Sequence, residues 1–329
     1  MAMSPFRIMT AAIAAEICFA SAVFAALALA GVTNGWFDLF NCVAPLLIAT
    51  GLGGAAASIA TWPKGRFRTV SVAAGMAGAL YGIAVSLPDA IGWLSGPGKG
   101  TGVAYRVVTA NVFRDNWRPG RGVGAILDRH ADAVILEEAN GTFQRAVPAL
   151  ASVYPYASVC PDAEVQIWLK TPILAQGCGM KTPPDTYRTW GRDFVWVRTM
   201  GPDGRPIVLA GVHLGRPYPP WRQPVERRAL AGSMGAMDNA RVLVAGDLNI
   251  VPWSFGMREL DGLMRPLTRR TFWLPTYPAL IKETRNGWTA PFLPIDHVYA
   301  GADWPRTKLT RFSVPGSDHF ALQVDAQLR

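Results

Sequence analysis

Three long apolar runs at the start of the chain set the strongest limit on its fold. They cover Ile8 to Val32, Leu39 to Trp62 and Val70 to Leu94, and each meets the requirement of about 20 residues for a helix that crosses a membrane. Charge is nearly absent from this part, whereas the rest of the 329-residue chain has the composition of an ordinary soluble domain. The sequence therefore predicts a membrane anchor of three helices over residues 1–94.

Small residues in the second and third runs predict a closely packed bundle. The segment from Gly78 to Gly82 places two glycines four residues apart on one helix face, where they let another helix approach. The first run alone could be a signal peptide, because Arg7 precedes it, but two more spans follow at once and favour an anchor. Glu16 is the one acid deep in a span, and a hydrogen bond within the helix packing is the preferred role for it over a lipid-headgroup or proton site.

Positive charge in the loops predicts the orientation of the anchor. The loop between the second and third runs carries Lys64, Arg66 and Arg68, whereas the loop from Thr33 to Asp38 carries no basic residue. Basic loops stay in the cytoplasm, so three spans place everything after residue 95 outside it. The prediction is a multi-pass protein of the cell membrane with an extracytoplasmic domain.

A flexible linker separates the anchor from that domain. Residues 95–101 contain three glycines and one proline, a composition typical of a mobile connection. Residues 102–329 form the soluble domain, in which strand and helix patterns alternate but several neighbouring strands lack a helix between them. This order predicts mixed sheets with helices outside. Strands are predicted at 103–112, 132–137, 165–169, 194–198, 207–213, 242–245, 295–299 and 309–314, and helices at 122–130, 144–151, 226–237 and 254–264.

Polar side chains recur where the predicted strands end. They are Asn111, Glu138, His213, Asp247, Asn249, Asp296, Asp318 and His319. Each alone has a structural explanation, such as a turn, a cap or a solvated acid. Together they supply what hydrolysis of a phosphate ester needs: oxygen ligands for a hard divalent cation and histidines beside acids that can move a proton. No Cys-x-x-Cys pair, P-loop or Gly-rich dinucleotide turn competes for this role.

The order of these motifs resembles the endonuclease/exonuclease/phosphatase superfamily, which includes deoxyribonuclease I and neutral sphingomyelinases. The resemblance covers about residues 103–329, and the three preceding spans make the chain similar to the membrane-anchored branch that includes teicoplanin-resistance proteins. The motifs are Val108-Thr-Ala-Asn111, Asp132-Ala-Val-Ile-Leu-Glu-Glu138, Gly211-Val-His-Leu214, Ala245-Gly-Asp-Leu-Asn249, Pro294-Ile-Asp-His297 and Gly316-Ser-Asp-His319. The resemblance implies a four-layer α/β sandwich, in which two mixed sheets are flanked by helices and the site lies at one rim.

Roles follow from the resemblance motif by motif. It implies that Glu138 is the main metal ligand, with Asn111 beside it. Asp247 would orient or deprotonate the attacking water, and Asn249 would hold the phosphate. His213 would contact the phosphate and stabilise the charge that develops on it. The implied metal is Mg²⁺, with Mn²⁺ as the alternative.

The last two motifs complete the implied site. Asp318 and His319 would act as a pair, in which His319 polarises the phosphate or takes a proton and Asp318 fixes its tautomer or reaches the metal. Asp296 would support a histidine from behind. The sequence departs from the family pattern at two places: Glu137 stands before Glu138, so either glutamate could bind the metal and we choose Glu138, and the run at 165–170 lacks the usual serine.

The net charge, the cysteines and the tryptophans limit which partners and surroundings the chain can have. The net charge of +9 favours polyanions, anionic lipid or phosphorylated substrates. Cys160 and Cys178 could pair in a disulfide outside the cytoplasm, and two unpaired thiols are the equal alternative. Most tryptophans of the soluble domain, Trp253 among them, are expected in its core rather than at a membrane interface.

Three functions remain open. The first is a metal-dependent phosphoesterase that acts on a phosphate ester, in one version lipid-linked, beside the lipid bilayer. The second is an extracytoplasmic nuclease acting on DNA, and the third is a catalytically inactive binding module on a membrane anchor. No protein partner is predicted.

Overall fold

The chain divides into two compact units. A computed structural model describes residues 4–161, 163–180, 193–279 and 290–329. The first unit consists of the chain up to Gly92 together with residues 251–258, and the second consists of residues 93–250 and 259–329. The sequence predicted a boundary between residues 94 and 102. It did not predict that residues 251–258 pack with the N-terminal helices.

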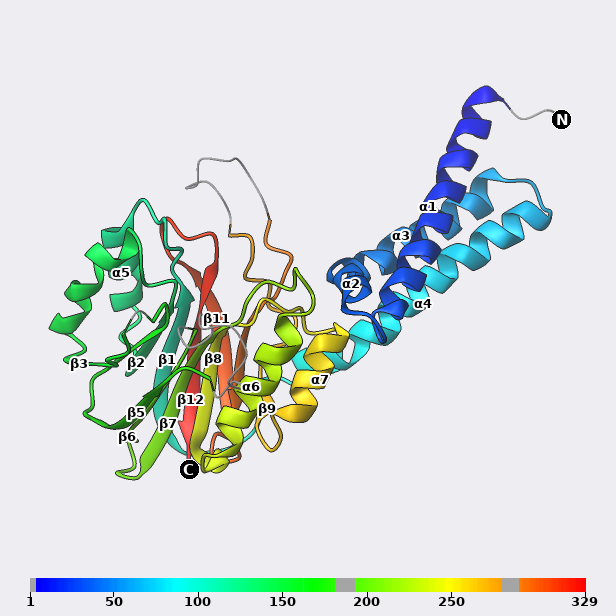
Figure 1. The fold of residues 1–329 in the computed structure, drawn as a ribbon. Coiled ribbons are helices and arrows are strands. Elements are labelled where there is room, and N and C mark those ends of the chain that lie inside the picture. The colour runs from blue at the N-terminus through cyan, green and yellow to red at the C-terminus, as the bar shows by residue number, and fades with distance from the viewer. Residues whose placement is uncertain (1–3, 162, 181–192, 280–289) are drawn as a thin grey trace. The chain divides into compact units, whose positions relative to one another are not determined.

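The first unit contains three helices that are long and apolar enough to cross a membrane, as predicted (Figure 1). Its elements are α1 (Pro5–Ala30), the short α2 (Gly35–Asp38), the 3₁₀ turn η1 (Leu39–Val43), α3 (Ala44–Thr61) and α4 (Arg66–Leu94). Ser4 begins α1 by accepting a hydrogen bond from the Arg7 amide, and Pro5 suits the first turn.

Glycines let these helices approach closely. A Cβ atom on Gly51 would lie 2.3 Å from the carbonyl oxygen of Gly75, and one on Gly78 would lie 2.7 Å from the Cβ atom of Ser21. The small-residue face predicted at Gly78 therefore forms a helix contact. Glu16 instead lies on the exposed side of α1, so its predicted role within the helix packing is wrong; its helix position faces away from α3 and α4.

The second unit is built on two mixed six-stranded sheets. The first sheet has the order β11 (Arg306–Ser313), β12 (Phe320–Leu328), β1 (Val103–Asn111), β2 (Ala133–Glu137), β4 (Gln166–Leu169) and β3 (Tyr156–Ala157). The second has the order β5 (Ile173–Cys178), β6 (Phe194–Met200), β7 (Pro206–His213), β8 (Val242–Asp247), β10 (Asp296–Ala300) and β9 (Thr268–Arg269). The pairs β1–β2 and β7–β8 are parallel, and their neighbours are antiparallel.

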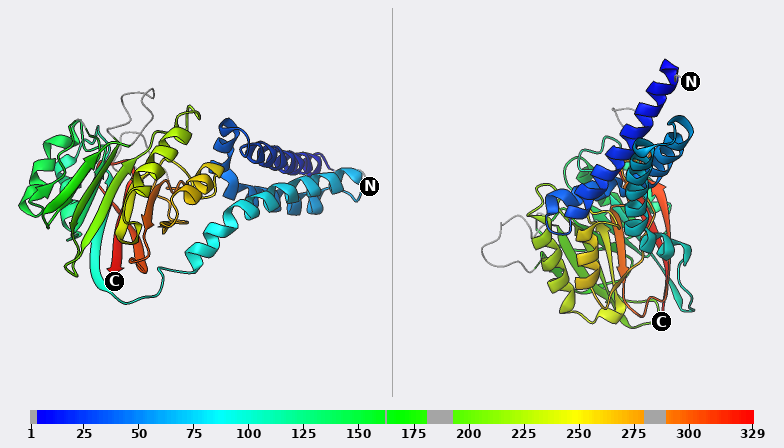
Figure 2. Two further views of the ribbon diagram at one scale, coloured as in Figure 1. Left: turned by 60° about the horizontal axis from the view of Figure 1, so that its bottom comes forward. Right: turned by 90° about the vertical axis from the view of Figure 1, so that its right-hand side faces the viewer.

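Alternating side chains build the layers between and outside the sheets. Val107 of β1 points into the core shared with Leu209 and Leu243 of the second sheet, whereas Val108 points outward toward Ile126. The helical elements are α5 (Pro119–Leu127), η2 (Phe143–Arg145), η3 (Val147–Ser152), α6 (Gln223–Gly235), η5 (Asn239–Arg241) and α7 (Phe255–Leu263). The α5 side covers the first sheet and α6 covers the second (Figures 1 and 2). The predicted four-layer sandwich, preceded by three apolar helices, is confirmed.

Some elements differ from their predictions. The helix predicted at 144–151 consists of two 3₁₀ segments, η2 and η3, because Pro148 interrupts the amide ladder. The strand β12 was not predicted, although Leu322, Val324 and Ala326 alternate inward along it. It lies between β11 and β1 and is therefore a central strand of the first sheet.

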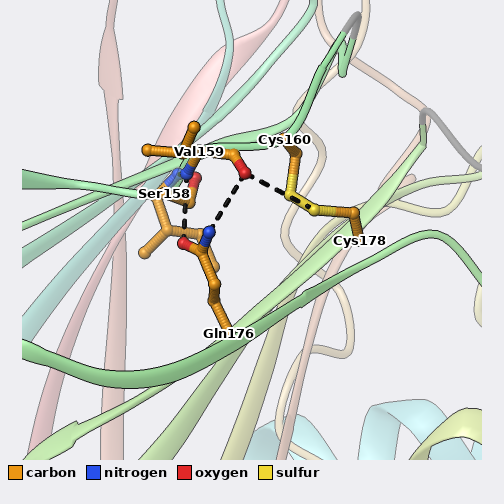
Figure 3. Close-up of a disulfide and its surroundings, with 6 residues drawn as sticks. Ser158, Val159, Cys160, Gln176 and Cys178 are labelled. Carbon is orange, nitrogen blue, oxygen red and sulfur yellow. Dashed lines mark hydrogen bonds between the residues drawn. A yellow bond between two sulfur atoms is a disulfide. The ribbon is translucent and has the colours of Figure 1, made fainter.

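A disulfide joins Cys160, in the segment before β4, to Cys178 at the end of β5 (Figure 3). Beside it, the backbone amide of Val159 donates to Oε1 of Gln176, and Nε2 of Gln176 donates to the carbonyl of Val159. The bond and these two contacts tie the segment that contains Glu164 to the second sheet. Of the two cysteines in the apolar helices, Cys18 is a buried free thiol and Cys42 is a half-buried one.

Candidate active site

The strand register brings the polar strand ends to one rim of the second unit. Parallel pairing sets Asn111 opposite Glu137 and His213 opposite Asp247. Antiparallel pairing sets Asp296, the first residue of β10, opposite Asp247 as well. Because the parallel strands end where their antiparallel neighbours begin, residues from six distant motifs meet at this edge.

Asp247 is the centre of the cluster. Its side chain is 1% exposed, and its Oδ2 lies 3.2 Å from Nδ2 of Asn111, 3.8 Å from Nε2 of His213 and 3.7 Å from Nε2 of His319. Burial raises the pKa of Asp247 to about 6, although the charge of His319 opposes the shift. Gly246 just before it has a φ of 150°, and a Cβ there would lie 1.9 Å from the Val212 carbonyl oxygen, so only glycine fits.

His319 is held by two acids. Its Nδ1 lies 3.0 Å from Oδ2 of Asp296, and the ring is also 5.0 Å from the ring of Tyr277. Burial alone would lower the pKa of His319, but Asp296 and Asp247 raise it to about 10. Asp296 therefore occupies the position behind a histidine that was predicted for it. The prediction that Asp318 fixes the tautomer of His319 or reaches the metal stays a prediction.

His213 has a partner that the sequence did not reveal. Oε2 of Glu164 lies 3.6 Å from Nδ1 of His213, on the ring side opposite Asp247. Burial opposes protonation of His213, but Glu164 and Asp247 raise its pKa to about 9. Asp193 lies near the same pair, and burial raises its pKa to about 7. The only sequence signal for Glu164 was an acid standing just before a predicted strand.

The side chains of the neighbouring residues Glu137 and Glu138 lie in different environments. Glu137 is completely buried and accepts a hydrogen bond from Thr109 at 2.7 Å, and burial raises its pKa well above the ordinary range. Glu138 adopts the left-handed backbone region, with a φ of 55°, and turns its side chain toward Asn111 and His213. Strained backbone of this kind is typical of functional sites.

Asn111 and Asn249 both present amide nitrogen atoms to the acids. Oδ1 of Asn111 accepts from the Phe113 amide, so its Nδ2 lies toward Asp247 and Glu138. Nδ2 of Asn249 donates to the Leu214 carbonyl at 2.9 Å, and its own amide donates to Oδ1 of Asp247 at 2.8 Å. Nδ2 of Asn111 thus donates to both Glu138 and Asp247, and its predicted role beside the metal stays a prediction.

Asp318 and two unpredicted residues complete the rim. Asp318 is half-buried, and burial together with Glu138 raises its pKa. Ser317 donates to the Asn111 carbonyl at 2.7 Å and accepts from the His319 amide, which joins the first and last motifs. Gln223 at the start of α6 donates to the carbonyl of Gly215 at 2.8 Å and to that of Asn249 at 3.2 Å, and so supports the turn after Asp247.

The donor set fits a divalent metal ion. One ligand atom each from Asp247, Asp296 and His319 lie within 4.8 Å of one another, and all three residues are buried. Oε2 of buried Glu137 finds no hydrogen-bond partner among the described residues. Burial, with a smaller effect of neighbouring acids, raises the pKa values of Glu137, Asp247 and Asp318. A bound cation would favour their charged forms, and carboxylate oxygens are the ligands that hard cations prefer. Glu138 and Asp318 are the further carboxylates at this rim.

Removing the charge of Glu164 should affect His213, its partner, and leave His319 undisturbed. We expect Glu164→Gln to lower the pKa of His213 and to reduce kcat by roughly tenfold, as is typical for a residue that orients another. Histidine titration by NMR and a pH–rate profile measure both effects. Glu259→Gln, which removes an acid paired with Arg227 outside the site, is the matched control, and an unshifted His213 titration would contradict the pairing.

The second unit is thus an α/β sandwich that gathers two buried acids and a histidine, a possible metal site, at the rim of its sheets. The sequence profile of the Endonuclease/Exonuclease/phosphatase family matches residues 108–319, which is more than half of the chain. The chain belongs to this family. No curated protein matches it in sequence.

Several solved structures share the fold. SmcL is 18% identical with a TM-score of 0.52, and the match covers 68% of this chain and 99% of that one. The endonuclease/exonuclease/phosphatase from Beutenbergia cavernae DSM 12333 is 18% identical with a TM-score of 0.52, covering 68% and 72%. TDP2 of D. rerio, solved with a single-strand DNA product, is 15% identical with a TM-score of 0.53, covering 68% and 99%. At these identities the likeness establishes the fold of the second unit.

Proposed function

We propose that this protein is a membrane-anchored phosphoesterase that needs a divalent metal, Mg²⁺ in the first place, and hydrolyses a phosphate ester outside the cytoplasm. The main support is the buried cluster of Asp247, Asp296 and His319 on the same chain as three apolar helices. We further propose a lipid-linked or envelope phosphate as substrate, because a tether raises the effective concentration of the enzyme at the membrane surface. On the same ground we propose that the protein belongs with the membrane-anchored branch similar to teicoplanin-resistance proteins.

The residues of the rim divide the chemistry among them. Asp247 is placed to orient the attacking water and to accept its proton. The cationic rings of His213 and His319 are placed to stabilise negative charge that develops on the phosphate. Asn249 would hold the phosphate, as the family resemblance implies. A bound Mg²⁺, held by Glu138 with Asp318 or by Asp247 with Asp296, would supply positive charge to the phosphate and the leaving oxygen.

Two features support a location outside the cytoplasm. Lys64 lies in the loop between α3 and α4, and Arg66 and Arg68 lie in the first turn of α4. Basic residues at such a connection remain inside. The disulfide of Cys160 and Cys178 belongs to the second unit, and such bonds persist in oxidising compartments. With three spans, these features agree on one orientation.

A nuclease is the second candidate. The net charge of +9 favours a polyanion, and TDP2, one of the proteins with this fold, was solved with DNA. Trp117 and Trp221 are exposed and could stack with bases. An inactive binding module is the third candidate, and the convergence of every predicted polar residue on one rim argues against it.

Turnover by the purified full-length protein in detergent tests the function. The panel contains a polyprenyl diphosphate, a phospholipid, sphingomyelin, duplex DNA and a soluble bis-aryl phosphodiester, each with Mg²⁺ and with chelator. Chelator-sensitive turnover of a lipid substrate is expected. Turnover of DNA alone would favour the nuclease, and a folded protein that neither binds Mg²⁺ nor hydrolyses any substrate would favour the binding module.

Cysteine labelling tests the orientation. Lys308→Cys introduces a thiol at an exposed position of β11, and Gly65→Cys introduces one in the basic loop, where a side chain has open space. A membrane-impermeant maleimide should label position 308 in intact cells and position 65 only after lysis. The reverse pattern would overturn the proposed location.

A further inference from the structure

Residues 251–258 belong to the first unit, together with the apolar helices. They follow the turn from Asp247 to Asn249 in the active site, which is the catalytic turn. The chain leaves the second unit after Ile250, three residues beyond Asp247, and returns to it at Glu259. Within the first unit Val251, Trp253 and Met257 are at most 3% exposed. A loop that merely connected two elements would lie on the surface, so this burial indicates a dedicated contact.

Asp38, at the end of α2, caps the helix that begins in this segment. Its Oδ1 accepts from the Phe255 amide at 2.9 Å, and its Oδ2 accepts from the Gly256 amide at 2.8 Å. Ser254, the first residue of the helix predicted at 254–264, accepts from the next amide, that of Met257, at 3.1 Å. A carboxylate at the first amides of a helix is favoured by charge-assisted hydrogen bonds and by the helix dipole.

The buried residue Asn41 forms hydrogen bonds with both Asp38 and Trp253. Asn41 is completely buried, and its Nδ2 donates to Oδ1 of Asp38 at 2.8 Å. The hydroxyl of Tyr81 on α4 donates to Oδ1 of Asn41 at 2.8 Å, and the indole of Trp253 donates to the Asn41 carbonyl at 2.6 Å. Asp38 and Asn41 thus contact residues 251–258 directly, and Tyr81 holds Asn41 in place. Arg258 adds a hydrogen bond to the Val85 carbonyl.

The other end of the segment is fixed by the catalytic unit. The Ile250 carbonyl lies 2.8 Å from Nε2 of buried His297, and the Asn249 amide donates to Oδ1 of Asp247. Asn249 has a φ of 52°, a conformation that persists only when its surroundings enforce it. Only three residues lie between Asn249 and Trp253, so the chain has little slack between the two fixed points.

We propose that Asp38 and Asn41 are positioning residues for the catalytic turn, and that they act along the chain through residues 250–253. The catalytic consequence rests on the proposed phosphoesterase function, whereas the effect on the Asn249 amide does not. Loss of the Asp38 carboxylate should release the start of α7 and, through residues 250–253, loosen the turn from Asp247 to Asn249.

Amide hydrogen exchange and turnover of the full-length protein in detergent test this role. In Asp38→Ala, exchange at Phe255 and Gly256 should rise by roughly tenfold, exchange at Asn249 should rise as well, and kcat for the soluble bis-aryl phosphodiester should fall by roughly tenfold. Asp38→Asn, which keeps one acceptor oxygen, should give smaller changes and serves if Asp38→Ala does not fold. Asn34→Ala removes the cap of Trp36 in the same loop and should change none of these values.

The outcomes separate the contact from its role. Unchanged exchange at Phe255 and Gly256 would show that the contact does not form. Increased exchange there, with wild-type exchange at Asn249 and wild-type kcat, would overturn the positioning role and leave a simple tether. If the wild-type protein hydrolyses no phosphodiester, the proposed function fails, and exchange at Asn249 alone decides whether Asp38 positions the turn.

Discussion

Asp247→Asn should reduce kcat/KM by about 10³-fold, within the range for loss of a general base. Asparagine keeps the size of the side chain and the oxygen that accepts from the Asn249 amide, so the fold should survive. Because burial raises the pKa of Asp247 to about 6, its charge at neutral pH is unfavourable without a cation. The metal-free variant should therefore melt at the same temperature as the wild type or higher.

Steady-state kinetics with Mg²⁺ and melting curves with and without chelator measure these two effects. Asp325→Asn is the matched control, because Asp325 is an acid of the same unit that pairs with Arg106 on the surface. Its kcat/KM should equal that of the wild type. Near-wild-type turnover by Asp247→Asn would remove Asp247 from the centre of the site.

His319→Ala should cause a second large loss, about 10²-fold or more in kcat. His319 interacts with both Asp296 and Asp247. If Glu138 and Asp318 hold the metal, Asp296→Asn should lower kcat less than His319→Ala, because it then disturbs only the orientation of the ring. The double variant should be no worse than His319→Ala alone, since residues that act as a unit are not additive. Fully additive losses would mean that the two residues act separately.

The same substitution has a pH-dependent effect on stability. The pKa of His319 rises from 6.5 to about 10 on folding. The protonated ring therefore stabilises the metal-free fold fully below pH 6.5, and this stabilisation is lost as the pH rises toward 10. The difference in melting temperature between the wild type and His319→Ala should shrink over that range, and a constant difference would contradict the pairing.

Much of the rim could be predicted because local patterns encode it. Asn111, His213 and Asp247 each follow a short apolar strand, and strand polarity alone brings such ends to one edge. The fold class followed from the same strands and from the motif order. Substrate, metal and orientation stay predictions that the experiments above address.

The residues that escaped prediction act over long sequence distances or from irregular segments. Glu164 reaches His213 from a segment without strand or helix periodicity. Asp38 caps an amide 217 residues away, and no local pattern signals such a partner. The strand β12 was missed because Gln323, Asp325 and Gln327 make it look polar, although its inward side chains alternate regularly.

The position of β12 between β11 and β1 has a consequence for folding during synthesis. β1 emerges early in synthesis, but Val103 pairs with Leu328 and the register runs along most of both strands. Until β12 has been synthesised, one edge of β1 lacks its partner, and an unpaired edge is prone to association with other chains. The first sheet therefore closes only after β12 has left the ribosome, so the second unit cannot be assembled progressively from its first strands.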